Sequence, residues 1–160
     1  LGGPPDVVVY SASGRLRGPV ADLDPDAVAR ALMVSAYGGF LVAQAAARRM
    51  LPRRHGAILL TGASASVKGF AESSPFAMGK FALRGLGQSL ARELQPRGIH
   101  VAHIVIDGAI RNPARGGEAP EAPDSHLDPD GIARAYRDLL RQDRSAWTSE
   151  LELRPWTERF

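Results

Sequence analysis

The 160-residue chain contains no cysteine, and only two of its 20 basic residues are lysines, Lys68 and Lys80. The lack of cysteine excludes a disulfide scaffold and thiolate chemistry, and it fits a reducing compartment. No apolar run approaches the roughly 18 residues of a membrane span, and the first residues, LGGPPDVVVY, do not have the pattern of a signal peptide. We therefore expect a soluble, cytoplasmic protein without a membrane partner.

The positive charge is modest, at a formal net +3, and almost all of it comes from arginine. These arginines are scattered along expected helices, without the basic stripe and interleaved aromatics of a nucleic-acid surface, so a solvated surface is the favoured interpretation. A chain that otherwise uses arginine but has lysine at position 80 suggests a need for a compact, tunable amine there. The arginine- and alanine-rich composition also hints at a GC-rich bacterial genome.

The hydrophobic pattern predicts one domain in which strands and helices alternate along the chain. Apolar strands that alternate with helices form a parallel sheet covered on both faces, so the fold class is α/β. Asp24 is expected to cap a long helix whose first residue is Pro25 and whose end is marked by Pro52. The expected strands are 6–13, 56–64, 99–108 and 149–155, and the expected helices are 23–50, 74–98 and 127–143.

Small polar residues follow three of these strands, in the sequences YSAS, TGASAS and IDGAI. Ligands of parallel sheets bind beyond the carboxyl ends of the strands, although strand-to-helix turns require small residues in any case. These sequences alone leave both explanations open. Residues 107–127 form a long segment rich in Gly, Pro and Ala, which favours a substrate lid over an idle loop.

The sequence SSPFAMGKFALRG, residues 73–85, places Phe76 and Lys80 four residues apart. Residues with this spacing lie on one face of a helix. A tyrosine at position 76 would form a proton-transfer pair with the lysine, as in many reductases. Phenylalanine has no proton to donate, so the sequence leaves open whether this protein catalyses a reduction.

Several motifs occur together in order: DVVVYSAS, then VSAYGGF, then TGASASVKG, then FAMGKFALRGLGQSLARELQPRGIHVAHIVIDGAI. In this order and spacing the chain resembles the C-terminal two-thirds of a short-chain dehydrogenase/reductase. The resemblance implies a partial Rossmann-like, doubly wound parallel sheet of three to four strands with NAD or NADP as the cofactor. The family's N-terminal Gly-rich βαβ unit has no counterpart here, so we expect a truncated chain that is inactive alone.

The resemblance also assigns residue roles. Lys80 matches the family lysine that binds the nicotinamide ribose, Phe76 stands at the catalytic tyrosine, and Ser35 stands at the asparagine of the proton relay. The substrate-orienting serine falls on Ala63, with Ser64 beside it. The candidate catalytic positions are therefore Lys80, Ser64, Ser35 and Phe76, and the candidate cofactor-binding residues are Ser11, Ala12, Ser13, Lys80, Asp107, Gly108 and Ile110.

Three other residues were considered as proton donors, namely His103, His126 and Tyr37, and for each a structural or solvent-exposed role is favoured. Two functions remain open. One is an atypical NAD(P)-dependent oxidoreductase that acts on a small carbonyl, alcohol or activated double bond, and the other is a catalytically silent ligand-binding or scaffold protein. The resemblance further implies a homodimer or homotetramer through helices 24–50 and 76–95.

Overall fold

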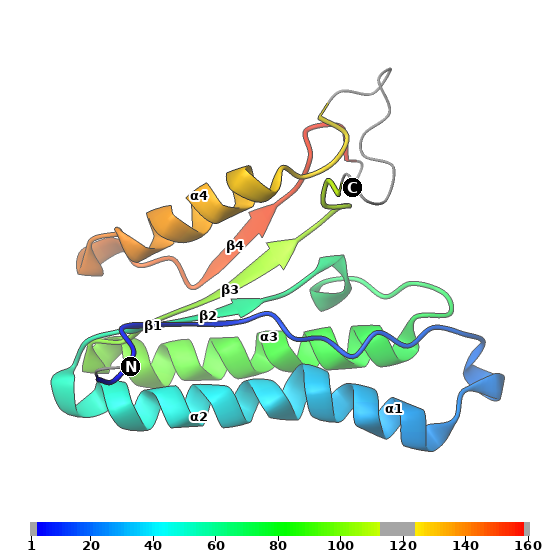
Figure 1. The fold of residues 1–160 in the computed structure, drawn as a ribbon, viewed down its shortest axis with the longest axis horizontal. Helices are drawn as coiled ribbons and strands as arrows, with labels where there is room; N and C mark the ends of the chain where they lie inside the picture. Colours follow the sequence, from blue (N-terminus) through cyan, green and yellow to red (C-terminus); the bar gives the residue numbers. More distant parts are fainter. Residues whose placement is uncertain (1–2, 113–123, 159–160) are drawn as a thin grey trace.

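A four-stranded parallel sheet forms the centre of the computed structural model, which describes residues 3–112 and 124–158 (Figure 1). Each strand is hydrogen-bonded to the next one along the chain, so the order in space equals the order in sequence. In the register of the two central strands, Leu60 lies opposite His103. The strands are β1 (Val7–Tyr10), β2 (Ala57–Thr61), β3 (His100–Ile106) and β4 (Glu150–Leu153).

Helices cover both faces of this sheet, with α2 and α3 on one face and α4 on the other (Figure 1). One apolar core lies between the sheet and helices α2 and α3 and includes Met50, Leu60 and Leu83. A second core, with Ile104 and Leu139, lies under α4. The helices are α1 (Pro25–Leu32), α2 (Gly38–Met50), α3 (Ser74–Leu94) and α4 (Pro129–Leu140). The predicted α/β fold is confirmed.

The predicted first helix, 23–50, is divided in the structure. A π-helical segment, Met33–Tyr37, separates α1 from α2. The predicted cap is present, because Asp24 accepts hydrogen bonds from the backbone N–H groups of Asp26 and Ala27 at 3.1 and 3.2 Å. The strands are shorter than predicted, since the small polar residues that follow them are outside the hydrogen-bonded ladder.

The helical segment Pro25–Arg53 is long and apolar enough to cross a membrane by length and composition alone. This is weak evidence, because a helix that packs on the sheet of a soluble domain has the same composition. Here Ala43, Ala46 and Met50 of α2 are buried in the core. Its other side is exposed and apolar, with Phe40 and Leu41 more than 40% accessible.

The predicted lid, 107–127, is only partly described, since residues 113–123 lie outside the described ranges. Its two ends meet, because Ile110 and Leu127 form a parallel bridge. The backbone N–H of Arg111 donates to Leu127 O at 2.9 Å, and the N–H of Leu127 donates to Ala109 O at 2.8 Å. The lid function itself stays a prediction.

Candidate functional site

Lys80 is a buried cation at the carboxyl ends of the strands. It belongs to the second turn of α3, is only 3% exposed, and its Nζ donates a hydrogen bond to Thr61 O, the last residue of β2, at 2.8 Å. Burial lowers the pKa of Lys80 from 10.5 to about 8, because an ammonium loses hydration there. The structure therefore holds an amine of near-neutral pKa at the edge where ligands of parallel sheets bind.

Phe76 is half-buried one turn before Lys80, and cations flank it. The Lys80 Nζ lies 6.0 Å from the centroid of its ring, and the guanidinium carbon of Arg15 lies 5.4 Å from it. Both distances are within the range of cation–π attraction. Arg15, which sequence reasoning missed, comes from the connection after β1. No sequence pattern indicates that it would meet Phe76.

Ser35 lies inside the π-helical segment and is completely buried. Its Oγ accepts a hydrogen bond from the Gly14 backbone N–H at 2.8 Å, which ties the connection after β1 to the helix. Tyr10 stabilises the same segment, since its hydroxyl donates to Val34 O. π-Helical turns within α-helices occur frequently at functional sites. In this one, the hydroxyl of Ser35 holds a neighbouring loop.

Close packing between α3 and Ser35 depends on Gly79. A Cβ at position 79 would lie 2.6 Å from Ser35 Cβ, too close for either backbone to remain in place. We expect Gly79→Ala to destabilise the fold by about 1 to 3 kcal/mol through overpacking. The matched control is Gly85→Ala on the same helix, where an added Cβ meets nothing within 4 Å. That variant should be stabilised by about 0.5 to 1 kcal/mol. Urea denaturation measures both, and a Gly79→Ala variant as stable as Gly85→Ala would contradict the packing argument.

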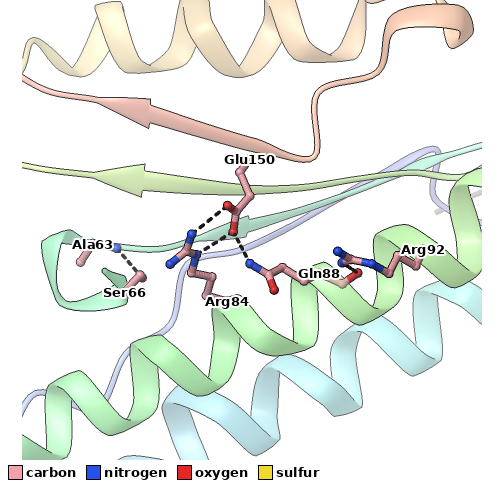
Figure 2. A network of polar contacts seen from close by, with 6 residues as sticks. All are labelled: Ala63, Ser66, Arg84, Gln88, Arg92 and Glu150. Carbon is pink, nitrogen blue, oxygen red and sulfur yellow. Dashed lines mark hydrogen bonds and ion pairs between the residues drawn. The ribbon is translucent and has the colours of Figure 1, made fainter. Parts of the chain in front are cut away.

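Hydroxyl groups near the end of β2 lie around Ala63. Ser64 begins a 3-10 turn, Ser64–Ser66, and is half-buried. Ser66 is completely buried, and its Oγ accepts a hydrogen bond from the Ala63 backbone N–H at 3.1 Å (Figure 2). Ser66 was not singled out from the sequence, although it is the third residue after Ala63 and so at the spacing at which a side chain returns to the backbone of a turn.

Asp107 directly follows β3 and is a buried carboxylate, 2% exposed. Its Oδ2 lies 3.3 Å from the Arg154 guanidinium and 3.5 Å from Lys68 Nζ, so one cation follows β4 and the other follows β2. The family resemblance gives Asp107 as a candidate cofactor-binding residue. In the structure it joins the ends of three strands. Gly108 follows with φ +149°, against Pro155.

The remaining predicted residues differ in exposure. Ser11, Ala12 and Ser13 are exposed along the chain after β1, and Ile110 is 49% exposed. Tyr37 is 47% exposed and stacks with Phe40. His126 is half-buried at the end of the predicted lid. The structure thus brings Lys80, Phe76 and Ser35 together around one turn of α3.

His103 is in the middle of β3, fully buried, and neither ring nitrogen has a hydrogen-bond partner among the described residues. A Cβ added to Gly62 would lie 2.4 Å from His103 Nε2, so the imidazole fills the space that a side chain would otherwise occupy. Burial lowers the pKa of His103 from 6.5 to about 4. This is a neutral core histidine, as the sequence interpretation favoured.

The fold and these side chains define a class, namely parallel α/β proteins with a ligand edge at the carboxyl ends of the strands. Residues 2–136 match the family described as enoyl-(acyl carrier protein) reductase. Human 17-beta-hydroxysteroid dehydrogenase type 1 is 38% identical over 99 residues, which cover 62% of this chain and 30% of that protein. A short-chain dehydrogenase from Rhodopseudomonas palustris superposes with a TM-score of 0.79 at 33% identity, covering 96% of this chain and 63% of that one. The chain belongs to the short-chain dehydrogenase/reductase family.

The similarity is partial in length. A further relative, (+)-borneol dehydrogenase 1 of Salvia officinalis, is 31% identical over 112 residues, or 68% of this chain and 43% of that protein. The chain thus spans less than half of either curated relative. The activity of the whole protein is accordingly a proposal.

Proposed function

We propose that this chain is the substrate-side part of an atypical NAD(P)-dependent oxidoreductase, in which Lys80 holds the nicotinamide ribose. The observation that carries the proposal is the position of Lys80, buried at the carboxyl edge and oriented by Thr61 O at 2.8 Å. Burying the Lys80 ammonium costs free energy of folding, so its presence here favours a role in binding a ligand. Solved structures with this fold include a metagenomic short-chain oxidoreductase in complex with NADP and a 4-hydroxyisoleucine dehydrogenase complexed with NADH.

The other residues have supporting roles in this proposal. Ser11, Ala12 and Ser13, with Gly108 and Ile110, lie at or after strand ends and would approach the cofactor, with Asp107 anchoring the edge through its ion pairs. A Gly-rich βαβ unit from outside these residues would supply the pyrophosphate site. The lid, 107–127, would cover the substrate. Neither NAD nor NADP is favoured.

The chemistry proposed is hydride transfer to or from a small carbonyl, alcohol or activated double bond. Phe76 cannot protonate an alkoxide, so a substrate that needs little enzymatic protonation fits best. The hydroxyls of Ser35 and Ser64 are the predicted relay groups. Arg15 could stabilise developing negative charge next to Phe76 without releasing its proton.

Phe76 also favours a second candidate, a catalytically silent protein that binds a nucleotide or another ligand as a scaffold. In either case we propose a homodimer or homotetramer through helices 24–50 and 76–95. The exposed apolar side chains on these helices support it, in particular Phe40 and Leu41 on α2 and Phe81 on α3.

Calorimetry with NADH and NADPH on the full-length protein tests the proposal. Lys80→Ala should weaken binding by about 10- to 100-fold, the effect of losing a hydrogen bond from a charged group. The control is Arg30→Ala, which removes one exposed cation paired with Asp24 at 3.4 Å and should leave the affinity unchanged. If the unmodified protein binds neither nucleotide, the oxidoreductase proposal is wrong and the scaffold candidate remains.

A further inference from the structure

Three helix-to-strand turns meet at the edge of the sheet opposite Lys80, on the left of Figure 1. They follow α2, α3 and α4, and the turn after α3 ends at Gly98, whose φ is +86°. A Cβ on Gly98 would lie 2.4 Å from Arg54 O, so glycine allows the first two turns to touch. Arg144 joins the third turn to them by donating from Nη2 to Arg54 O at 3.4 Å.

These turns surround a cleft of about 540 Å³, which is within the size range of small-molecule sites. Arg54, Arg92 and Arg144 line it, each from a different helix or turn, and among the residues that the structure describes no Asp or Glu lines it. Within residues 3–112 and 124–158, none of the three arginines forms an ion pair with a carboxylate. The cleft therefore collects three positive charges without neutralising them.

Neighbouring carboxylates are engaged elsewhere. Asp143 Oδ1 accepts hydrogen bonds from the backbone N–H and the hydroxyl of Ser145 at 2.8 and 2.6 Å. Glu150 lies in an adjoining hollow of about 320 Å³ and is held by Arg84 at 2.7 Å (Figure 2). Arg92 lines both hollows, whereas Arg54 and Arg144 line only the main cleft and Glu150 lines only the adjoining one.

Trp147 forms one wall of the cleft and is held by a stacked ring. Trp147 stacks on the buried ring of His100, with centroids 4.8 Å apart and planes 1° from parallel. The Arg144 guanidinium lies 5.9 Å from the Trp147 ring, within cation–π range. His100 in turn is hydrogen-bonded to Thr148 O at 2.9 Å. Trp147 is thus held by its stacking on His100 before any ligand arrives, which lowers the entropic cost of ordering this side chain on binding.

We propose that this cleft is a second binding site, for a small polyanion that carries two or more phosphate groups. Guanidinium groups bind phosphate oxygens in a bidentate manner. A ligand with several phosphate charges therefore matches three arginines better than a ligand with a single carboxylate does. The site lies at the amino ends of the strands, across the sheet from Lys80, so it does not depend on the proposed oxidoreductase function.

Calorimetric titration of the protein with inorganic pyrophosphate and tripolyphosphate tests the site. We expect saturable binding that weakens at least about tenfold in Arg92→Ala and in Arg144→Ala, since each loses a charge-assisted hydrogen bond. The charge-matched control is Arg17→Ala, an exposed arginine outside the cleft, which should bind as the unmodified protein does. In a Trp156→Phe background, Trp147 is the sole tryptophan, and its emission should change on saturation.

Lys80→Ala separates this site from the proposed nucleotide site. Unchanged pyrophosphate affinity in Lys80→Ala supports the cleft, whatever happens to NADH binding. Loss of pyrophosphate binding in Lys80→Ala would overturn the proposal, because the ligand would then occupy the other edge of the sheet. Absence of saturable binding, or equal affinity in the Arg92→Ala/Arg144→Ala double variant, would overturn it as well.

Discussion

Phe76→Tyr is expected to raise the rate of carbonyl reduction by the full-length protein by about 10² to 10⁴, the contribution of a positioned general acid. Hydride transfer to a carbonyl leaves an alkoxide, and the phenylalanine ring has no proton for it. A phenol at this position would share a helix face with Lys80, whose Nζ is 6.0 Å from the ring centroid. The nearby ammonium and the Arg15 guanidinium at 5.4 Å favour the phenolate and so lower the tyrosine pKa toward neutrality.

Steady-state reduction of a panel of aldehydes and ketones, with NADH or NADPH, measures this gain. The matched control is Phe81→Tyr, which places the same hydroxyl on the same helix at a residue that is 45% exposed and should leave the rate unchanged. The double variant Phe76→Tyr/Lys80→Ala should lose most of the gain, because the ammonium no longer assists the phenol. If nucleotide binds and Phe76→Tyr still gives no increase over Phe81→Tyr, loss of the acid is not what limits reduction.

The alternation of strands and helices could be predicted because each element carries its own local signal. The β-branched run before Tyr10 gives a strand, and the two Asp-Pro pairs, beginning at Asp24 and Asp128, begin helices at the expected places. Gly38 and Gly39 let α2 approach β1 and α3 closely. A Cβ on the first would meet Tyr10 Oη, and a Cβ on the second would meet Leu83.

The contacts that give the candidate site its character could not be predicted, because they join residues far apart in sequence. Arg15 contacts Phe76, although helices α1 and α2 lie between them in the sequence. Asp107 pairs with Lys68 and Arg154, which follow neighbouring strands. The π-helical segment was missed for a different reason. Its sequence, MVSAY, has no unusual helix propensity, and what marks the segment is the tertiary hydrogen bond from Tyr10 to Val34 O.

At about pH 4, His103→Leu is expected to stabilise the fold by on the order of 3 kcal/mol. Burial lowers the pKa of His103 from 6.5 to about 4, because the charged ring would lose its hydration in the core. As pH falls from 6.5 to 4, the His103 imidazole becomes protonated in the unfolded chain but stays neutral in the native protein. Stability is therefore lost over that window. Leucine binds no proton in either state, so the variant lacks this loss.

The charged groups around His103 change stability in other pH windows. Glu150, whose pKa Arg84 and Gln88 lower to about 2 by hydrogen bonding, contributes stability that is lost only as pH falls from about 4.5 to 2 (Figure 2). Lys80, with its pKa near 8, makes stability rise with pH between about 8 and 10.5, since the unfolded chain binds the proton more tightly. His100 has a lowered pKa as well, mainly from burial, and adds to the acidic limb.

Urea unfolding at a series of pH values between 4 and 8 isolates the His103 effect. In His103→Leu, the slope of unfolding free energy against pH should fall by up to one proton, or about 1.4 kcal/mol per pH unit, between pH 4.5 and 6. An unchanged slope in His103→Leu would mean that the imidazole is protonated in the native state, and Glu150 would then be its counter-ion. Because neither ring nitrogen has a partner in the described part of the chain and the side chain is inaccessible, we expect the neutral ring. We then also expect the core to lose stability in acid before the Arg84–Glu150 pair does.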